Sequence, residues 1–302
     1  MKAIVLRRWL ALVGFLGLAR AEEVILRPVA DTTLFAFTPD NNAGRESSVV
    51  LGGINKASSA CRVLVRFGLE TNLPPGAVIT GVSLTVAVTK EKGSAGALEA
   101  EWHRLLKPWG EGAKTGRAGG NPAAVGEATW NSRQHGQAAW SSAGGNGDFV
   151  ATASATHSLD NSETVVIAST PGLLTDVRFW QTQPTNNFGW LILAPGEIVP
   201  GSARRLASRE AAAGAMTLKL SYTVPTPPAA LKISIHRLAE GQLEVSFPGM
   251  IGFRYSIQRQ SPALGASWED LAAFRPFSEQ IYRQVLAPVA TNEIFRVVAE
   301  PR

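Results

Sequence analysis

Apolar and polar residues alternate with a period of two along many short segments, and no other feature of the sequence constrains the fold as strongly. Side chains of a strand point alternately to opposite faces of its sheet, so this alternation is typical of strands with one buried face. Helical periodicity is scarce, and we expect one short helix at 171–180. The pattern predicts strands at 24–27, 48–51, 62–67, 79–89, 98–105, 164–168, 189–193, 205–208 and 217–222. An all-β protein follows from this pattern.

The first 21 residues have the pattern of a cleaved secretory signal peptide. Three basic residues open the segment, an apolar run covers 9–18, and the small residues Ala19 and Ala21 precede the expected cleavage point after Ala21. The apolar run is too short to cross a bilayer, and no later segment is continuously apolar for long enough. We therefore expect a protein that is secreted or held at the cell surface and does not span a membrane.

Export removes most of the apparent basicity of the chain. Of its 29 basic residues, four lie in the expected signal peptide, which leaves 25 against 24 acidic residues in the mature protein. Nucleic-acid binding depends on a strong positive field, and the mature chain carries no dense run of Lys or Arg. The sequence therefore argues against a nucleic-acid partner.

Cys61 is the only cysteine, so no disulfide can form within the chain. It shares its alternation with Val63, Val65 and Phe67, which favours a small buried side chain over a reactive thiol. Without disulfides the fold must rely on its hydrophobic core, and about 280 residues can bury one or two.

A proline-rich segment divides the sequence. Prolines at this density, within 225–230, form a stiff extended spacer rather than a strand. After it, residues 231–302 hold five or six further short strands, among them 231–237, 243–247, 255–260 and 294–298. We expect a β domain over 22–224, a linker over 225–230 and a small β domain over 231–302.

Several short motifs occur in a characteristic order before the linker. They are the segments 30–33 (ADTT), 42–44 (NAG), 62–67 (RVLVRF), 74–77 (PPGA), 109–111 (WGE), 129–133 (TWNSR), 186–191 (NNFGWL) and 207–210 (ASRE). In this order they resemble the DNRLRE domain, a module of secreted bacterial and archaeal proteins classed among the carbohydrate-binding modules. The second domain resembles the small fibronectin-III-like modules of exported bacterial proteins, at 255–258 and 294–297.

The resemblance implies a fold and a class of ligand. It implies an antiparallel, jelly-roll-like β-sandwich followed by a small second β-sandwich, an extracellular or cell-surface location, and an acidic polysaccharide such as alginate as partner. The sequence departs from the family at Gly68, where an acidic residue is usual, and in its enlarged loop at 110–126.

Arginines are the first candidates for ligand contacts, because a planar guanidinium can bond both oxygens of a sugar carboxylate. Arg62 and Arg66 lie on the face of their strand opposite Val63 and Val65. With Arg133 and Arg205 they could line a groove for an anionic glycan. The alternative is that such arginines pair with carboxylates, among them Glu111 and Glu210, to hold the sandwich together.

Tryptophans are the second candidates, since an indole ring can stack on a sugar. Trp130, Trp180 and Trp190 lie within family motifs or on a helix face, which favours the core. Trp109 and Trp140 lie beside glycines or small polar residues in loops. These two are our stacking candidates.

A structural calcium ion is a further candidate, because calcium takes oxygen ligands from carboxylates and loop carbonyls. The candidate ligands are Asp31, Asp40, Asn41 and Glu210, although no dedicated calcium-binding spacing is present.

The pair Arg209–Glu210 has two interpretations. On an extended strand the two side chains would lie on opposite faces, and the inward charge would need a partner. The pair is thus either a structural ion pair that closes the sandwich or part of a site.

Catalytic motifs are absent from the sequence: it contains no H-E-x-x-H, C-x-x-C or G-x-S-x-G pattern. We expect a secreted, non-catalytic protein that binds an acidic polysaccharide. The first alternative is a structural or adhesion component of the envelope with protein partners. The second is a polysaccharide lyase, for which Tyr222, Tyr255 and Tyr282 are the only tyrosines.

Overall fold

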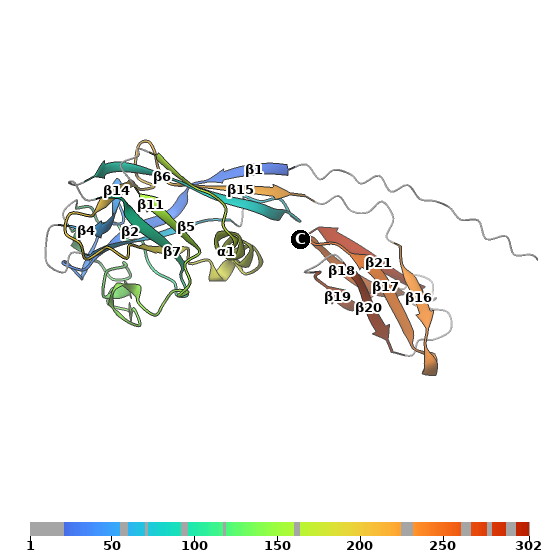
Figure 1. The fold of residues 1–302 in the computed structure, drawn as a ribbon. Coiled ribbons are helices and arrows are strands. Elements are labelled where there is room, and N and C mark those ends of the chain that lie inside the picture. The colour runs from blue at the N-terminus through green and yellow to red at the C-terminus, as the bar shows by residue number, and fades with distance from the viewer. Residues whose placement is uncertain are drawn as a thin grey trace, which may run out of the picture. The chain divides into compact units, whose positions relative to one another are not determined.

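A computed structural model describes residues 21–54, 60–69, 72–91, 96–116, 119–159, 164–224, 232–260, 267–276, 280–287 and 294–301. Residues 1–20 of the expected signal peptide (1–21) and the expected linker at 225–230 lie outside the described residues. Contacts within the chain divide it into one unit over Glu22–Tyr222 and another that includes Thr223–Arg302. Both units are built from antiparallel strands (Figure 1). No helix among the described residues is long and apolar enough to cross a membrane.

The first unit is an antiparallel β-sandwich, as the sequence predicts. Its strands run in the order β1-β15-β6-β14-β4-β5-β13-β7-β11, with β12 beside β6 and β2 beside β5. These strands are β1 (Ala21–Leu26), β2 (Pro28–Phe35), β4 (Ser48–Gly53), β5 (Ala60–Phe67), β6 (Val78–Glu91), β7 (Leu98–Arg104), β11 (Ala155–Leu159), β12 (Thr164–Ile167), β13 (Trp190–Leu193), β14 (Arg204–Ala207) and β15 (Thr217–Thr223). Short two-stranded pairs join β3 (Asn41–Asn42) to β8 (Asn121–Pro122) and β9 (Ser132–Gln134) to β10 (Ala138–Ala139).

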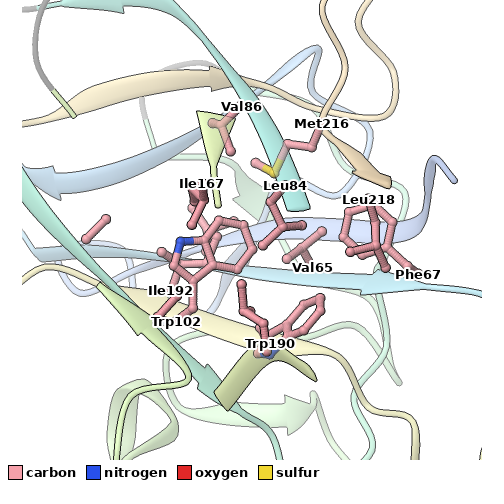
Figure 2. Packing of buried hydrophobic residues seen from close by; sticks show 14 of the residues in the cluster. Val65, Phe67, Leu84, Val86, Trp102, Ile167, Trp190, Ile192, Met216 and Leu218 are labelled. Carbon is pink, nitrogen blue, oxygen red and sulfur yellow. The ribbon is translucent and has the colours of Figure 1, made fainter. Parts of the chain in front are cut away.

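The main hydrophobic core of the first unit lies between the two facing layers of the sandwich. Val65 and Phe67 of β5 face Leu84 and Val86 of β6 in one buried cluster (Figure 2). Trp190 is fully buried within it, and its ring meets the ring of Trp102 edge-on at 5.9 Å and that of Trp180 at 4.5 Å. Each such edge-to-face pair stabilises the fold by about 0.5–1.5 kcal/mol beyond the contribution of burying the two rings.

One α-helix, α1 (Pro171–Thr182), packs on this core close to its predicted bounds. Thr170 caps its start by accepting a hydrogen bond from the Leu173 amide at 3.1 Å, and Pro171 needs no partner for the amide hydrogen it lacks. The helix buries Leu173, Val177 and Trp180.

The other face of the β5–β13 layer is covered by the segment between β7 and β11. Leu64 and Leu191 on this face pack beneath Leu105, Trp109 and Trp140 in a second buried cluster. The covering segment includes the enlarged loop at 110–126, most of whose described residues are half-buried or exposed. Two buried polar side chains hold the covering segment in place.

Asn42 and Glu127 are these two side chains. The Asn42 amide donates to the carbonyls of Glu111 and Ala128 at 2.8 and 2.9 Å. The Glu127 carboxylate accepts from the amides of Ala113 and Ala124, both at 2.8 Å. Because buried backbone groups must find partners, such bonds replace the sheet hydrogen bonds that a loop lacks.

The second unit is a small sandwich of two three-stranded sheets, in agreement with the predicted second β-sandwich. One sheet has the order β16-β17-β20 and the other β19-β18-β21. The strands are β16 (Ser234–Arg237), β17 (Leu243–Gly249), β18 (Phe253–Gln260), β19 (Glu269–Phe274), β20 (Gln280–Leu286) and β21 (Ile294–Pro301). Phe247, Tyr255 and Ile257 form its core.

Candidate functional site

Arg62 is buried beneath the covering segment and does not line an open groove. Its guanidinium forms a bidentate ion pair with Glu197, with nitrogen–oxygen distances of 2.7 to 3.2 Å. It also donates to the carbonyl of Gly144 at 2.7 Å and to Oδ1 of Asn146 at 2.9 Å, and it lies 5.1 Å from the ring centroid of Trp130. All of these contacts are internal, so Arg62 follows the structural alternative for the arginines.

The two candidate stacking tryptophans are also buried. The Trp109 indole donates to the carbonyl of Phe188 at 2.8 Å, and the Trp140 indole donates to that of Thr129 at 2.9 Å. Only 7% of Trp109 and 5% of Trp140 is exposed. Their placement does not fit the expectation that their faces meet a sugar, because both rings project from the covering segment into the second buried cluster.

Arg66 and Arg133 remain half-buried at the boundary of this cover. The Arg66 Nε is buried and has no hydrogen-bond partner among the described residues. One amine of Arg133 donates to the Pro108 carbonyl at 3.1 Å. Neither arginine forms an ion pair with a described carboxylate. Arg205, the fourth candidate, is half-exposed on β14, where it pairs with Val50 of β4.

Three carboxylates and one arginine converge where β2, the covering segment and the turn after β14 meet. Ligand oxygens of Asp31, Glu111 and Glu210 lie within 4.8 Å of one another. Arg209 binds both oxygens of Glu111, at 2.5 and 2.9 Å, and one oxygen of Glu210 at 3.0 Å. Its backbone amide donates to Asp31 at 2.7 Å. We call these four residues the Asp31 cluster.

Burial dominates the electrostatics of the Asp31 cluster. Desolvation raises the pKa of Asp31 from 3.8 to about 7, a rise opposed by the Arg209 amide and supported by the charges of Glu210 and Glu111. Burial also raises the pKa of Glu210. One protonated carboxyl can therefore remain in the cluster near neutral pH.

The predicted calcium ligands are only partly brought together. Asp31 and Glu210 meet, but their third carboxylate is Glu111. Asp40 is exposed and accepts from the Asn131 amide at 3.0 Å, while the Asn41 amide donates to the Gly119 carbonyl at 2.9 Å.

Arg209 supplies the positive charge at the centre of the Asp31 cluster. Its guanidinium engages both oxygens of Glu111 and one of Glu210, which a calcium ion would need as ligands. The residues therefore fit an arginine-centred ion-pair cluster better than a resident calcium ion.

The prediction that Arg209 and Glu210 lie on an extended strand is wrong. Strand β14 ends at Ala207, and both charged residues lie in the turn that follows. A turn lets neighbouring side chains converge, which explains why Arg209 contacts Glu210 instead of pointing to the opposite face. The structural role that the sequence offered for this pair agrees with its contacts.

A second buried polar cluster had no signature in the sequence. Asp176 of α1 accepts from the Ser154 hydroxyl at 2.5 Å and from the Trp190 indole at 2.8 Å. It also pairs with the guanidinium of Arg104 at 2.9 Å, which in turn lies 4.3 Å from the ring centroid of Phe179. The spacing between these residues follows no local period, so only the fold brings them together.

Groups capable of acid–base chemistry are engaged in structural contacts. His103 is buried, with one ring nitrogen 2.9 Å from the Val150 carbonyl and the other 3.2 Å from Glu101. The Tyr222 hydroxyl donates to Glu22 at 3.0 Å, and the Tyr255 hydroxyl accepts from the Met250 amide at 3.0 Å. Cys61 is fully buried, and burial raises the pKa of its thiol to about 12.

No protein-family model and no curated protein matches this chain. The resemblance to the DNRLRE domain stays a prediction from the motifs.

Proposed function

We propose that the Glu22–Tyr222 unit is the non-catalytic binding module of a secreted protein, and that it binds an acidic polysaccharide such as alginate. The binding contacts are arginine–carboxylate pairs at Arg66 and Arg133. Arg62, Trp109 and Trp140 are excluded from the binding surface by their burial. The proposal thus keeps the ligand class that the motifs imply and changes the residues that contact it.

This proposal rests on one observation: Arg66 has no carboxylate partner among the described residues. Some arginines of the unit have carboxylate partners: Arg62 pairs with Glu197, and Arg209 with Glu111. Arg66 has no such partner among the described residues, and its buried Nε lacks an acceptor. Because the Arg66 side chain as a whole is only half-buried, a ligand carboxylate could supply the partner that its guanidinium lacks.

Arg133 is connected to Arg66 through a chain of contacts. The backbone of Arg66 lies against Gly189, which has a φ of 76° and leaves no room for a side chain. Next to it, the Phe188 carbonyl accepts from Trp109, and Arg133 donates to Pro108 beside that tryptophan. These contacts connect the backbone of Arg66 with the guanidinium of Arg133 through Trp109 and its neighbours.

Affinity electrophoresis in gels containing alginate, polygalacturonate or a neutral glucan tests this function. We expect the two acidic polymers to retard the protein and added salt to weaken the retardation. Arg66→Gln and Arg133→Gln should reduce it, while Arg45→Gln, the same change at an exposed turn residue, should not. Equal mobility of the wild type in all three gels would refute the proposal.

A structural or adhesion role with protein partners is the second candidate. Ile198, at 79%, is the most exposed large apolar side chain described in the unit, and its neighbour Val199 is 50% exposed. Adjacent exposed apolar side chains favour contacts with a protein over contacts with a sugar. Co-purification of envelope proteins with the wild type, and their loss with Ile198→Ser, would favour this role over glycan binding.

A further inference from the structure

Strand β21 is the longest edge strand among the described residues of the second unit. It lies at the end of the sheet β19-β18-β21 and runs for eight residues, from Ile294 to Pro301. The outer edge of such a strand presents amide and carbonyl groups that can pair with another strand. Within the described residues of this unit, nothing hydrogen-bonds to that edge.

Two of the other three edges of this unit, β16 and β19, carry protections that β21 lacks. The third, β20, pairs regularly with β17, but its single charged residue, Arg283, offers no pair of opposite charges. Strand β16 has four residues only. Strand β19 pairs with β18 through an irregularity between Ile257 and Gln258, and it begins with the exposed acidic residues Glu269 and Asp270. Short strands, bulges and charges are the usual means of preventing edge pairing. Strand β21 is regular over its whole length against β18 and has proline only at its last position.

Strand β21 carries opposite charges at Arg296 and Glu300, which lie at equal distances along the strand from Val298. Phe295, Val297 and Ala299 pack against the core of the unit, so Arg296, Val298 and Glu300 lie on the outer face. In a symmetric antiparallel pair of two identical strands, opposing residues must share a face, and the twofold axis passes through one residue. Only an axis at Val298 places each Arg296 opposite the Glu300 of the other copy.

We propose that β21 pairs with β21 of a second copy of this chain, antiparallel and centred on Val298, to form a homodimer through a six-stranded sheet. Two opposite-charge cross-strand pairs then fix the register, and the apolar face of the sheet continues across the dimer. Arg296 is already held on its own strand, because its Nε donates to Gln258 at 2.7 Å and it stacks over Trp268 at 4.0 Å. The proposal is independent of the glycan-binding function.

Sedimentation of charge variants tests this register. The variants Arg296→Glu and Glu300→Arg each place like charges opposite each other in both pairs, so each should weaken the dimer at least about tenfold. An equimolar mixture should recover dimers, because every mixed pair then joins opposite charges. This recovery also distinguishes an interface effect from a local one, since Glu300→Arg introduces a charge across from Arg254 on β18. Arg283→Glu, at an exposed position of β20, is the matched control and should dimerise like the wild type.

Cysteine cross-linking gives a second, direct measurement. With Val298→Cys, the two thiols face each other across the axis, and mild oxidation should give a covalent dimer. Val285→Cys, on the exposed part of β20, should cross-link far less, and the native Cys61 is fully buried. A wild type that is monomeric at all concentrations, equal cross-linking at both positions, or no recovery on mixing the charge variants would each overturn the proposal.

Discussion

Arg62 and Glu197 form a bidentate ion pair that is almost entirely withdrawn from solvent, with 10% and 13% of their side chains exposed. Arg62 comes from β5, and Glu197 comes from the connection between β13 and β14. The same guanidinium binds the carbonyl of Gly144 in the covering segment. This one side chain therefore ties three parts of the sandwich together.

Replacing Arg62 by alanine should strongly destabilise the first unit. It would leave the Glu197 carboxylate buried without a counter-charge and the Gly144 carbonyl without this donor, at a cost of about 3–5 kcal/mol. Chemical denaturation followed by tryptophan fluorescence measures the loss. The double change Arg62→Met with Glu197→Gln should recover part of it, since no buried charge remains. A single variant as stable as the wild type would contradict the structural role.

The Asp31 carboxyl should make the first unit less stable as the pH rises. Its pKa is about 7 in the folded protein and 3.8 without burial, so the folded state holds the extra proton between these values. Its contribution is therefore fully present below about pH 4 and lost as the pH rises through 7, by on the order of a few kcal/mol. Melting temperatures from pH 5 to 8 should fall more steeply for the wild type than for Asp31→Asn.

Glu99→Gln is the control for this pH series, because Glu99 is an exposed carboxylate on β7. It should leave the slope of the wild type unchanged. If Asp31→Asn has the slope of the wild type, the ionisation of Asp31 does not control this pH dependence.

The strands were predictable because each one carries its own alternation. All nine strands that the pattern predicts in the first unit are present, and the helix starts at the predicted Pro171. The alternation does not predict strand β2, because its six consecutive buried residues from Ala30 to Phe35 include the polar residues Asp31, Thr32 and Thr33. A strand buried on both faces loses the period of two.

The candidate site could not be read from the sequence to the same extent. Whether Arg62 and Trp109 are exposed depends on how the segment between β7 and β11, to which Trp109 itself belongs, folds over the sheet face that carries Arg62. Nothing local in either residue signals that cover. Likewise Glu111 lies 98 positions from Arg209 along the chain. Residues that the fold alone brings together leave no spacing to recognise.

Removing the guanidinium of Arg209 should create a calcium dependence that the wild type lacks. In Arg209→Ala, the oxygens of Asp31, Glu111 and Glu210 would lie within 4.8 Å without a positive charge, and three carboxylates suit calcium. We expect millimolar calcium to raise the melting temperature of this variant but not that of the wild type. Arg45→Ala is the control. Equal stabilisation of the wild type by calcium would instead favour a resident ion in the Asp31 cluster.

Replacing Asp176 by asparagine should loosen the contact between α1 and the sandwich. Asp176 accepts hydrogen bonds from Ser154 and Trp190 and forms an ion pair with Arg104. An asparagine amide has one acceptor oxygen and no charge, so the Arg104 guanidinium would lose its counter-ion. The expected loss is about 2–4 kcal/mol in the free energy of unfolding.

Denaturant titration measures this loss, and the emission of Trp190 and Trp180 should report it, because both rings lie against the helix contact. Asp40→Asn is the matched change at an exposed aspartate whose hydrogen bond from Asn131 an amide oxygen can still accept. It should cost less than about 0.5 kcal/mol. Equal stability of the two variants would mean that the Asp176 contacts contribute no more than a surface hydrogen bond, and that apolar packing alone holds α1 on the core.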